Sequence, residues 1–422
     1  PKCRNAIKKA KGLYFVHNEG VGNAAVNQVW TQGETEASSC WFPTIDSPNQ
    51  KTSQEIYMTV PDRFKTLSNG ILESQIAHID GTRTDYWNFT QKHAPYLFFM
   101  GVGEFTIVED SYKNIPLQYY VAEKYAPQAK AIFGNTPEMM AFFSEKLDVD
   151  YPWSSYNQLV GNGFMNAGMA NTTAVIHGEQ AYQVPGQLID ENRHENAIAN
   201  ALFQHWFGSL VTAESWSNIA LNTSFAKYGE YLWKEHKYGK DAADAHLLEQ
   251  IAMYKEGDHF DKNLVRYYYK NQEDVFDVVS SSKGAAIVHM LRNYVGDVAF
   301  FSALNMYLTK FKYQSAEVHQ LRLAFEKVTG KDLNWFFNQW YFGKGHPNLE
   351  ITYDYNLLEK KVSVNVLQRA AVFHFPLAID IFEEGKLRRE NIFIDGEETS
   401  FVFSYTKVPE ILLVNADGLL LA

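Results

Sequence analysis

The chain has 422 residues, of which 46% are hydrophobic and 15% aromatic. This composition is typical of a packed globular protein with two or three domains and excludes a disordered chain. The net charge of −11 argues against a general nucleic-acid binder, because phosphate contacts require a basic face. We expect Cys3 and Cys40 to be free thiols, with a single disulfide as the alternative, and no apolar run approaches the roughly 20 residues that span a bilayer.

Residues 1–105 are predicted to form a β-domain. In IYMTVP (56–61) every second side chain is apolar ahead of a proline, as in a half-buried strand. SNG at 68–70 and DG at 80–81 indicate turns.

From about residue 114 to 345 the hydrophobic spacing is that of helices. NTPEMMAFFSEKL (135–147) has a Thr-Pro start, an acidic first turn and a basic end. ENAIANALFQHWFG (195–208) is predicted to be a helix that ends at Gly208, because glycine is the usual residue after the last helical turn.

From residue 348 to 422 the hydrophobic spacing falls to two, which predicts short strands. EEGK (383–386) and DGEE (395–398) are predicted to be hairpin turns. About 75 residues of such strands favour a small β-sandwich.

The segment NALFQHWFG (200–208), taken alone, predicts a buried core helix with one polar stripe. Asn200 and Gln204 are four residues apart and therefore share a face. Most of the remaining circumference is apolar and consists of Ile198, Ala199, Leu202, Phe203, Trp206 and Phe207.

Six segments, in order and at matching spacing, resemble the alanyl-aminopeptidase family, the gluzincin zinc aminopeptidases, and most of all its branch typical of Bacteroidetes. They are WFPTIDSPNQKTSQEIYMTVP (41–61), AGMANTTA (167–174), NALFQHWFGSLVTAESWSN (200–218), LNTSFAKYGEYLW (221–233), DVVSSSKGAAIVHMLR (277–292) and LNWFFNQWYFGKGHPNLEI (333–351). The resemblance implies an α+β multidomain fold: the remainder of an amino-terminal β-domain (1–105), a thermolysin-like, mostly helical peptidase domain (106–345) and a carboxy-terminal β-sandwich (346–422).

The resemblance also implies a zinc site, against which each residue can be compared. Such enzymes hold zinc with two histidines of an HExxH helix and a later glutamate, and the glutamate within the motif is the general base. Here Asn200 and Gln204 align with the histidines, Ala201 with the base and Thr223 with the third ligand. Because an amide oxygen is a poor zinc ligand and a methyl group accepts no proton, we expect no zinc and no other cofactor.

Two further positions of the family's active site also differ in type. The glutamate of the GAMEN strand, which in the family holds the free amino group of the substrate, aligns with Ala170. The tyrosine that stabilises the oxyanion aligns with Ser281, whose hydroxyl is too short for that role. Edge pairing with a peptide needs only main-chain groups, so the candidate peptide-binding strand comprises Gly168, Met169, Asn171 and Thr172.

Other histidines and acids of the chain are further candidates for metal ligands. A metal site built from His177, His194 or His205 is the alternative to structural roles for these residues. Glu179, Glu214 and Glu230 are scattered in the sequence, and we expect them to be at the surface or structural. We expect the altered site to be a repacked, metal-free and neutral core, since burying unpaired carboxylates is costly.

The sequence therefore predicts a catalytically inactive aminopeptidase homologue, a pseudoenzyme that acts as a peptide-binding, protein-binding or scaffold subunit. Its expected partner is an unknown protein or extended peptide, with no nucleic acid, and the resemblance places it in the periplasm or cell envelope, as a subunit of a larger envelope complex. The alternative is an active zinc metallo-aminopeptidase with unrecognised ligands. A different enzymatic activity has less support, because Ser281 and Ser282 lack recognisable His and Asp partners.

Overall fold

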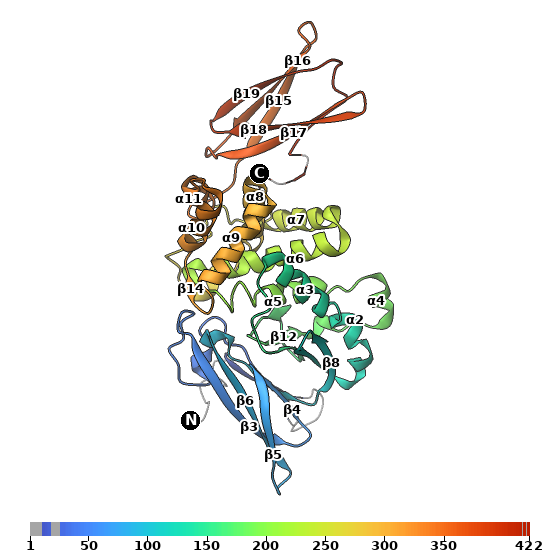
Figure 1. Ribbon diagram of the computed structural model, residues 1–422, viewed down its shortest axis with the longest axis vertical. Coiled ribbons are helices and arrows are strands. Elements are labelled where there is room, and N and C mark those ends of the chain that lie inside the picture. Colours follow the sequence, from blue (N-terminus) through green and yellow to red (C-terminus); the bar gives the residue numbers. More distant parts are fainter. Residues whose placement is uncertain (1–10, 18–25, 416, 419) are drawn as a thin grey trace.

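The computed structural model describes residues 11–17, 26–415, 417, 418 and 420–422. Cys40 is described and is a free thiol, whereas Cys3 lies outside the described residues. A β-domain, a mostly helical domain and a second β-domain follow one another along the long axis of the molecule (Figure 1). This arrangement confirms the predicted α+β multidomain fold. The residue boundaries between the domains stay predictions.

The amino-terminal domain consists of two antiparallel sheets. One sheet has the order β1 (Leu13–His17), β2 (Val26–Thr31), β7 (Met100–Gly103), β4 (Lys65–Ser68), and the other has the order β3 (Thr52–Pro61), β6 (Thr82–His93), β5 (Ile71–Ala77). Met58 and Val60 of β3 are buried, whereas Tyr57 and Thr59 are exposed, so the predicted alternation is confirmed.

The central domain combines a five-stranded sheet with a group of helices. The sheet order is β11 (Gly168–Met169), β12 (Ala174–Gly178), β10 (Tyr156–Gly161), β9 (Ile115–Val121), β8 (Thr106–Tyr112), which leaves β11 at one edge. The helices are α2 (Ala129–Phe133), α3 (Thr136–Leu147), α4 (Pro185–Asp190), α5 (Glu195–Phe203), α6 (Ala220–Tyr238), α7 (Lys240–Lys255), α8 (Gly284–Val295), α9 (Asp297–Lys310), α10 (Val318–Thr329) and α11 (Asn334–Trp340). The short strands β13 (Thr212–Ala213) and β14 (Ser315–Ala316) pair in parallel.

Helix α5 is buried, as predicted, but it is shorter than predicted. It ends at Phe203, and the predicted end at Gly208 is wrong. The chain instead makes a buried turn in which the Gly208 N–H donates to the Val211 carbonyl (2.9 Å), so the rings that follow the helix still reach the core. The Phe207 ring stacks on Phe225 of α6 at 4.4 Å between centroids.

The carboxy-terminal domain is the predicted β-sandwich, built from two three-stranded sheets. Their orders are β15 (Leu349–Asn356), β16 (Lys361–Gln368), β19 (Glu398–Ser404) and β18 (Lys386–Ile394), β17 (Phe375–Glu383), β20 (Ile411–Val414). EEGK is a hairpin turn, because Glu383 pairs with Lys386. DGEE is not, because it carries the chain from β18 to β19 in the opposite sheet, where β19 pairs with β16.

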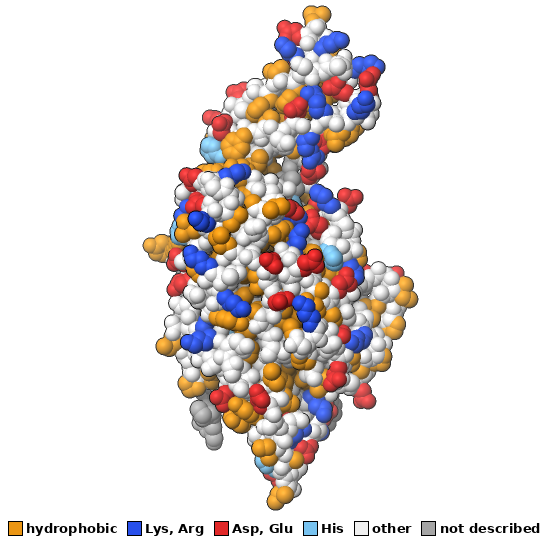
Figure 2. Space-filling model, in the orientation of Figure 1, with side chains coloured by type: hydrophobic (Ala, Val, Ile, Leu, Met, Phe, Trp, Pro, Cys, Tyr) orange, Lys and Arg blue, Asp and Glu red, His pale blue; other side chains and the backbone are white. Residues whose placement is uncertain are grey.

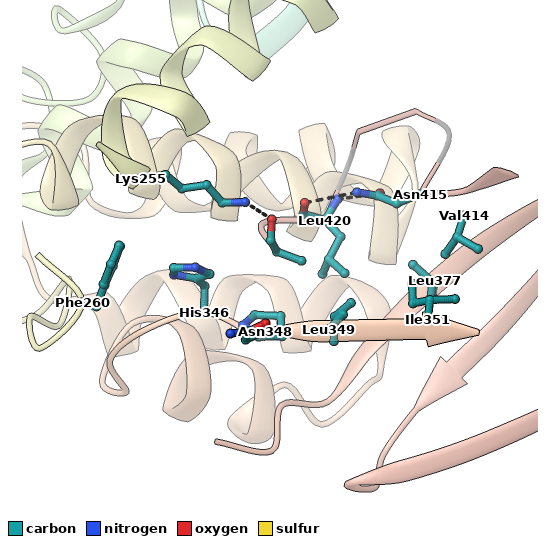
Figure 3. Close-up of a pocket in the computed structure, with 12 residues that line it drawn as sticks. Lys255, Phe260, His346, Asn348, Leu349, Ile351, Leu377, Val414, Asn415 and Leu420 are labelled. Carbon is teal, nitrogen blue, oxygen red and sulfur yellow. Dashed lines mark hydrogen bonds between the residues drawn. The ribbon is translucent and has the colours of Figure 1, made fainter. Parts of the chain in front are cut away.

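A cavity of about 520 Å³ lies where the central domain meets the sandwich, and Lys255, Phe260 and His346 line one end of it (Figure 3). On the face seen in Figure 2, acidic and basic side chains are interspersed rather than gathered in one basic field. No helix in the described part of the chain has the length and apolar character needed to cross a membrane.

Candidate functional site

The two residues predicted at the histidine positions contact each other. The Gln204 amide Nε2 donates to Asn200 Oδ1 (2.9 Å), and Asn200 Nδ2 donates to Glu230 Oε1 on α6 (2.8 Å). Gln204 follows the last residue of α5, but its backbone N–H still donates to the Asn200 carbonyl, so both side chains remain on one face. The Asn200 oxygen is thus engaged by Gln204, and its nitrogen faces a carboxylate.

Glu230 is the charged centre of this cluster. It is only 3% exposed, and its carboxylate accepts hydrogen bonds from Lys227 Nζ (3.1 Å to each oxygen) and from His246 Nε2 on α7 (2.9 Å). Burial alone would raise the pKa of Glu230, but the Lys227 ammonium and the hydrogen bonds from His246 and Asn200 together hold it below its ordinary value. The expectation of a neutral core is therefore wrong, because a compensated ion pair lies beneath the two amides.

Thr223 and Ser281, at two of the other altered positions, bond to backbone carbonyls. Thr223 Oγ1 donates to the Ser280 carbonyl (2.8 Å), which ties α6 to the π-helical turn Val279–Lys283. Ser281, in that turn, donates to the Asp277 carbonyl (2.8 Å). Ala201 is buried. These side chains hold the local fold and present no negative oxygen to a cation.

The candidate peptide-binding strand is partly accessible. Gly168 and Met169 pair antiparallel with His177 and Ile176 of β12, and the opposite side of β11 has no neighbouring strand among the described residues. The next three residues of the predicted site, Ala170, Asn171 and Thr172, are buried. The open edge is therefore confined to residues 168–169 and the exposed residues 165–167 before them.

The three histidines considered as replacement ligands do not come together. His194 Nε2 and His177 Nδ1 are 2.9 Å apart and share a hydrogen bond, and His177 Nε2 contacts Gln158 Oε1. His205 lies elsewhere, donating from Nδ1 to the Ala201 carbonyl and accepting the Thr173 N–H at Nε2. Burial lowers the pKa of His194 and of His205 to about 4, so both rings are neutral at physiological pH.

The donors around Asn200 do not fit a zinc ion. Catalytic zinc requires three protein ligands drawn from imidazole, thiolate and carboxylate. Asn200 Oδ1 accepts a hydrogen bond from Gln204, and the Thr223 hydroxyl donates its proton to a carbonyl. The Glu230 carboxylate already accepts hydrogen bonds from Lys227, His246 and Asn200. Within the described ranges, no group of three or more His, Cys, Asp or Glu side chains is arranged to hold a metal ion.

Four residues of this region were missed by the sequence analysis or given no site role. Lys227 and Glu230 are three apart on a predicted helix, a spacing that favours an ion pair, whereas His246 gives no local signal. Glu34 is the fourth: burial raises the pKa of its carboxyl group to about 7. Its charge influences Tyr96, whose hydroxyl accepts a hydrogen bond from Asn222, the neighbour of Thr223.

Comparisons with known proteins agree with this architecture. The chain is 26% identical over 343 residues to aminopeptidase 2, mitochondrial, of Saccharomyces cerevisiae, covering 77% of this chain and 35% of the yeast protein. It is 23% identical over 414 residues to the probable aminopeptidase 1 of Sulfurisphaera tokodaii, covering 94% and 50%. The crystal structure of Legionella pneumophila aminopeptidase A in complex with aspartic acid superposes with a TM-score of 0.84 at 17% identity, covering 97% of this chain and 48% of that one.

The chain thus spans about half or less of the length of these relatives. The Peptidase M1 N-terminal domain matches residues 6–97, and the Peptidase family M1 domain matches residues 132–340. Because the two matches follow in order and together cover more than two thirds of the 422 residues, the chain belongs to the M1 peptidase family.

Proposed function

We propose that this chain is a catalytically inactive aminopeptidase homologue that binds an extended peptide or protein segment. The observation that carries the proposal is the hydrogen-bonded row in which Gln204 donates to Asn200 and Asn200 donates to Glu230. The sequence resemblance assigns the two histidine positions to Asn200 and Gln204. Hydrolysis in this family requires a metal-activated water and a base, and neither Ala201 nor Thr223 supplies a group for that chemistry.

The open edge of β11 supports the binding half of the proposal. An extended peptide can add to an unpaired strand edge through main-chain hydrogen bonds alone. Ala170 offers no carboxylate for a free amino terminus, so the expected ligand is recognised by its backbone. Binding is weak, because the open strand is short.

Metal content and turnover test the catalytic half. We expect the purified protein, incubated with zinc and desalted, to retain far less than one zinc per chain by mass spectrometry. We also expect no hydrolysis of fluorogenic Ala-, Leu- or Glu-aminomethylcoumarin substrates with zinc added. One tightly held zinc per chain, together with turnover that a chelator abolishes, would support the active-enzyme alternative instead.

Peptide chemistry tests the binding half. Fluorescence anisotropy would compare an extended peptide with its N-acetylated form and with a form N-methylated at alternate backbone nitrogens. We expect acetylation to change the affinity by less than about threefold, and N-methylation to abolish binding because it removes the pairing donors. Strong dependence on the free amine would contradict the proposal.

A matched pair of variants locates the binding edge. Ala167→Pro removes one backbone N–H at the exposed residue immediately before β11, whereas Ala167→Ser keeps it. Only the proline variant is expected to weaken peptide binding. Equal affinities for both variants would place the peptide elsewhere.

A further inference from the structure

A second cavity, of about 530 Å³, lies between the amino-terminal β-domain and the sheet of the central domain. Strands β4, β5 and β6 contribute one wall, and β8, β9 and β10 contribute the other. Pockets of this size at domain interfaces are a usual location for small-molecule sites. We propose that this cavity binds a small, neutral, hydroxyl-rich ligand of the size of a mono- or disaccharide, independently of the altered peptidase site.

Two side-chain amides stand side by side in the central-domain wall, whose other polar lining residues are Asn114, Tyr120, Ser154 and Ser155. Asn157 of β10 and Gln118 of β9 are register partners on neighbouring parallel strands, so their side chains stand side by side on one face of the sheet. The Tyr120 hydroxyl donates to Gln118 Oε1 (3.0 Å), which leaves the Gln118 NH₂ group free to donate. Residues two apart on a strand share a face, so Tyr120 extends the same row.

The side chain of Asn157 lacks a protein partner. The residue is only 3% exposed and lines the cavity, and its amide makes no hydrogen bond with any residue in the described part of the chain. The amide is not among the described side-chain atoms that are both fully buried and without a partner, so it faces the open space of the cavity, where water or a ligand hydroxyl can pair with it. The amide offers one acceptor and two donors to the cavity, which is the pairing that a ligand hydroxyl can complete.

The opposite wall is rigid. Asp85 is fully buried and accepts hydrogen bonds from Arg83 Nε (2.6 Å), Thr66 Oγ1 (2.6 Å) and Gln75 Nε2 (2.9 Å). Trp87 Nε1 donates to the same Thr66 hydroxyl (3.0 Å), which fixes the indole against the cavity. Side chains locked in this way hold a binding site in its productive geometry before the ligand arrives.

The chemistry of the lining argues against three other ligand classes. A divalent cation would need free carboxylates, but both Asp85 oxygens are engaged. A polyanion would need several cations, and the guanidinium of Arg83 is committed to Asp85 and to backbone carbonyls, which leaves Lys65. A purely apolar ligand would leave Asn157 and Gln118 unpaired.

Saturation-transfer NMR and calorimetry on the full chain test the proposal with glucose, galactose, N-acetylglucosamine, maltose and lactose. We expect at least one saccharide to bind with a Kd of about 1 mM or tighter. Asn157→Ala is expected to weaken it at least tenfold. Gln118→Ala, at a half-buried position, provides a second variant if Asn157→Ala does not fold. Asn88→Ala is the matched control, because Asn88 lies on β6 beside Trp87 but points to the other face.

Three outcomes would overturn the proposal. One is no saccharide binding up to about 50 mM, well above the expected Kd. Another is saccharide binding that Asn157→Ala and Gln118→Ala leave unchanged, or that Asn88→Ala weakens equally. The third is that inorganic phosphate or an N-acetylated dipeptide amide, tested in parallel, binds the cavity while the saccharides do not.

Discussion

The ammonium group of Lys227 lies 3.1 Å from both carboxylate oxygens of Glu230, one turn further along helix α6. Glu230 Oε1 also accepts a hydrogen bond from the Asn200 amide. One carboxylate oxygen therefore links the Lys227 ammonium to Asn200, the position expected for a zinc ligand. In metal sites, a carboxylate commonly accepts the free N–H of a ligating histidine. Here an internal cation compensates that buried carboxylate.

Introducing the family's zinc-site residues alone should not give tight zinc binding. We predict that the variant Asn200→His, Ala201→Glu, Gln204→His, Thr223→Glu binds zinc at least about 100-fold more weakly than the same variant with Lys227→Thr added. Two unit charges about 6 Å apart repel by roughly 3 kcal/mol near a protein surface, and zinc carries two charges. Competition with a fluorescent chelator measures both zinc affinities. Equal affinities would show that the charge of Lys227 does not oppose zinc binding.

The Lys227–Glu230 pair should matter for stability. Lys227→Met leaves a buried carboxylate short of its cation, and we expect a loss of about 2–4 kcal/mol in unfolding free energy, seen as a lower melting temperature in calorimetry. Adding Glu230→Gln should recover most of that loss. Lys234→Met, elsewhere on α6 and outside the ion pairs, should stay within about 0.5 kcal/mol of the native chain. If Lys227→Met melted like Lys234→Met, the pair would be dispensable.

The buried pair His177 and His194 should destabilise the protein in acid. The pKa of His194 falls from 6.5 to about 4 because burial disfavours its charged form. The unfolded chain therefore takes up a proton first, so the stabilising contribution is complete above pH 6.5 and is lost as the pH falls from 6.5 through 4. That contribution is about 3 kcal/mol. His194→Gln keeps a donor toward His177, and its melting temperature should fall less over this range; a parallel decline would refute the assignment.

Glu34 should make the folded protein less stable as the pH rises, whereas His194 makes it less stable as the pH falls. Its pKa is raised to about 7 by burial, so the folded state holds a proton that the unfolded chain releases near pH 4.5. Its contribution is therefore complete below pH 4.5 and is lost as the pH rises through 7, by about 1–3 kcal/mol. Glu34→Gln should be more stable than the native chain at pH 8 and similar at pH 4. Identical melting curves at pH 8 would show that the Glu34 carboxyl is not desolvated.

The predictions made from local sequence patterns are confirmed where the structure depends only on residues that are neighbours in the chain. Alternation in 56–61 predicted a strand, and EEGK predicted a hairpin, because both depend on neighbouring residues. DGEE has the same turn composition, yet it joins two sheets, since the partner of β19 is the distant β16. The end of α5 was missed for a similar reason: the turn after Phe203 is closed by Val211, and the rings that follow pack against α6.

The sequence by itself determined which side chains stand at 170, 200, 201, 204, 223 and 281, and therefore which proton acceptors and metal ligands those positions can supply. Only the tertiary structure decided what surrounds them. Asn200, Glu230 and His246 come from three helices, and Asn157 faces residues of another domain across the cavity. The charge of a buried carboxylate and the partner of a buried amide depend on groups far apart in the chain, and packing alone brings those groups together.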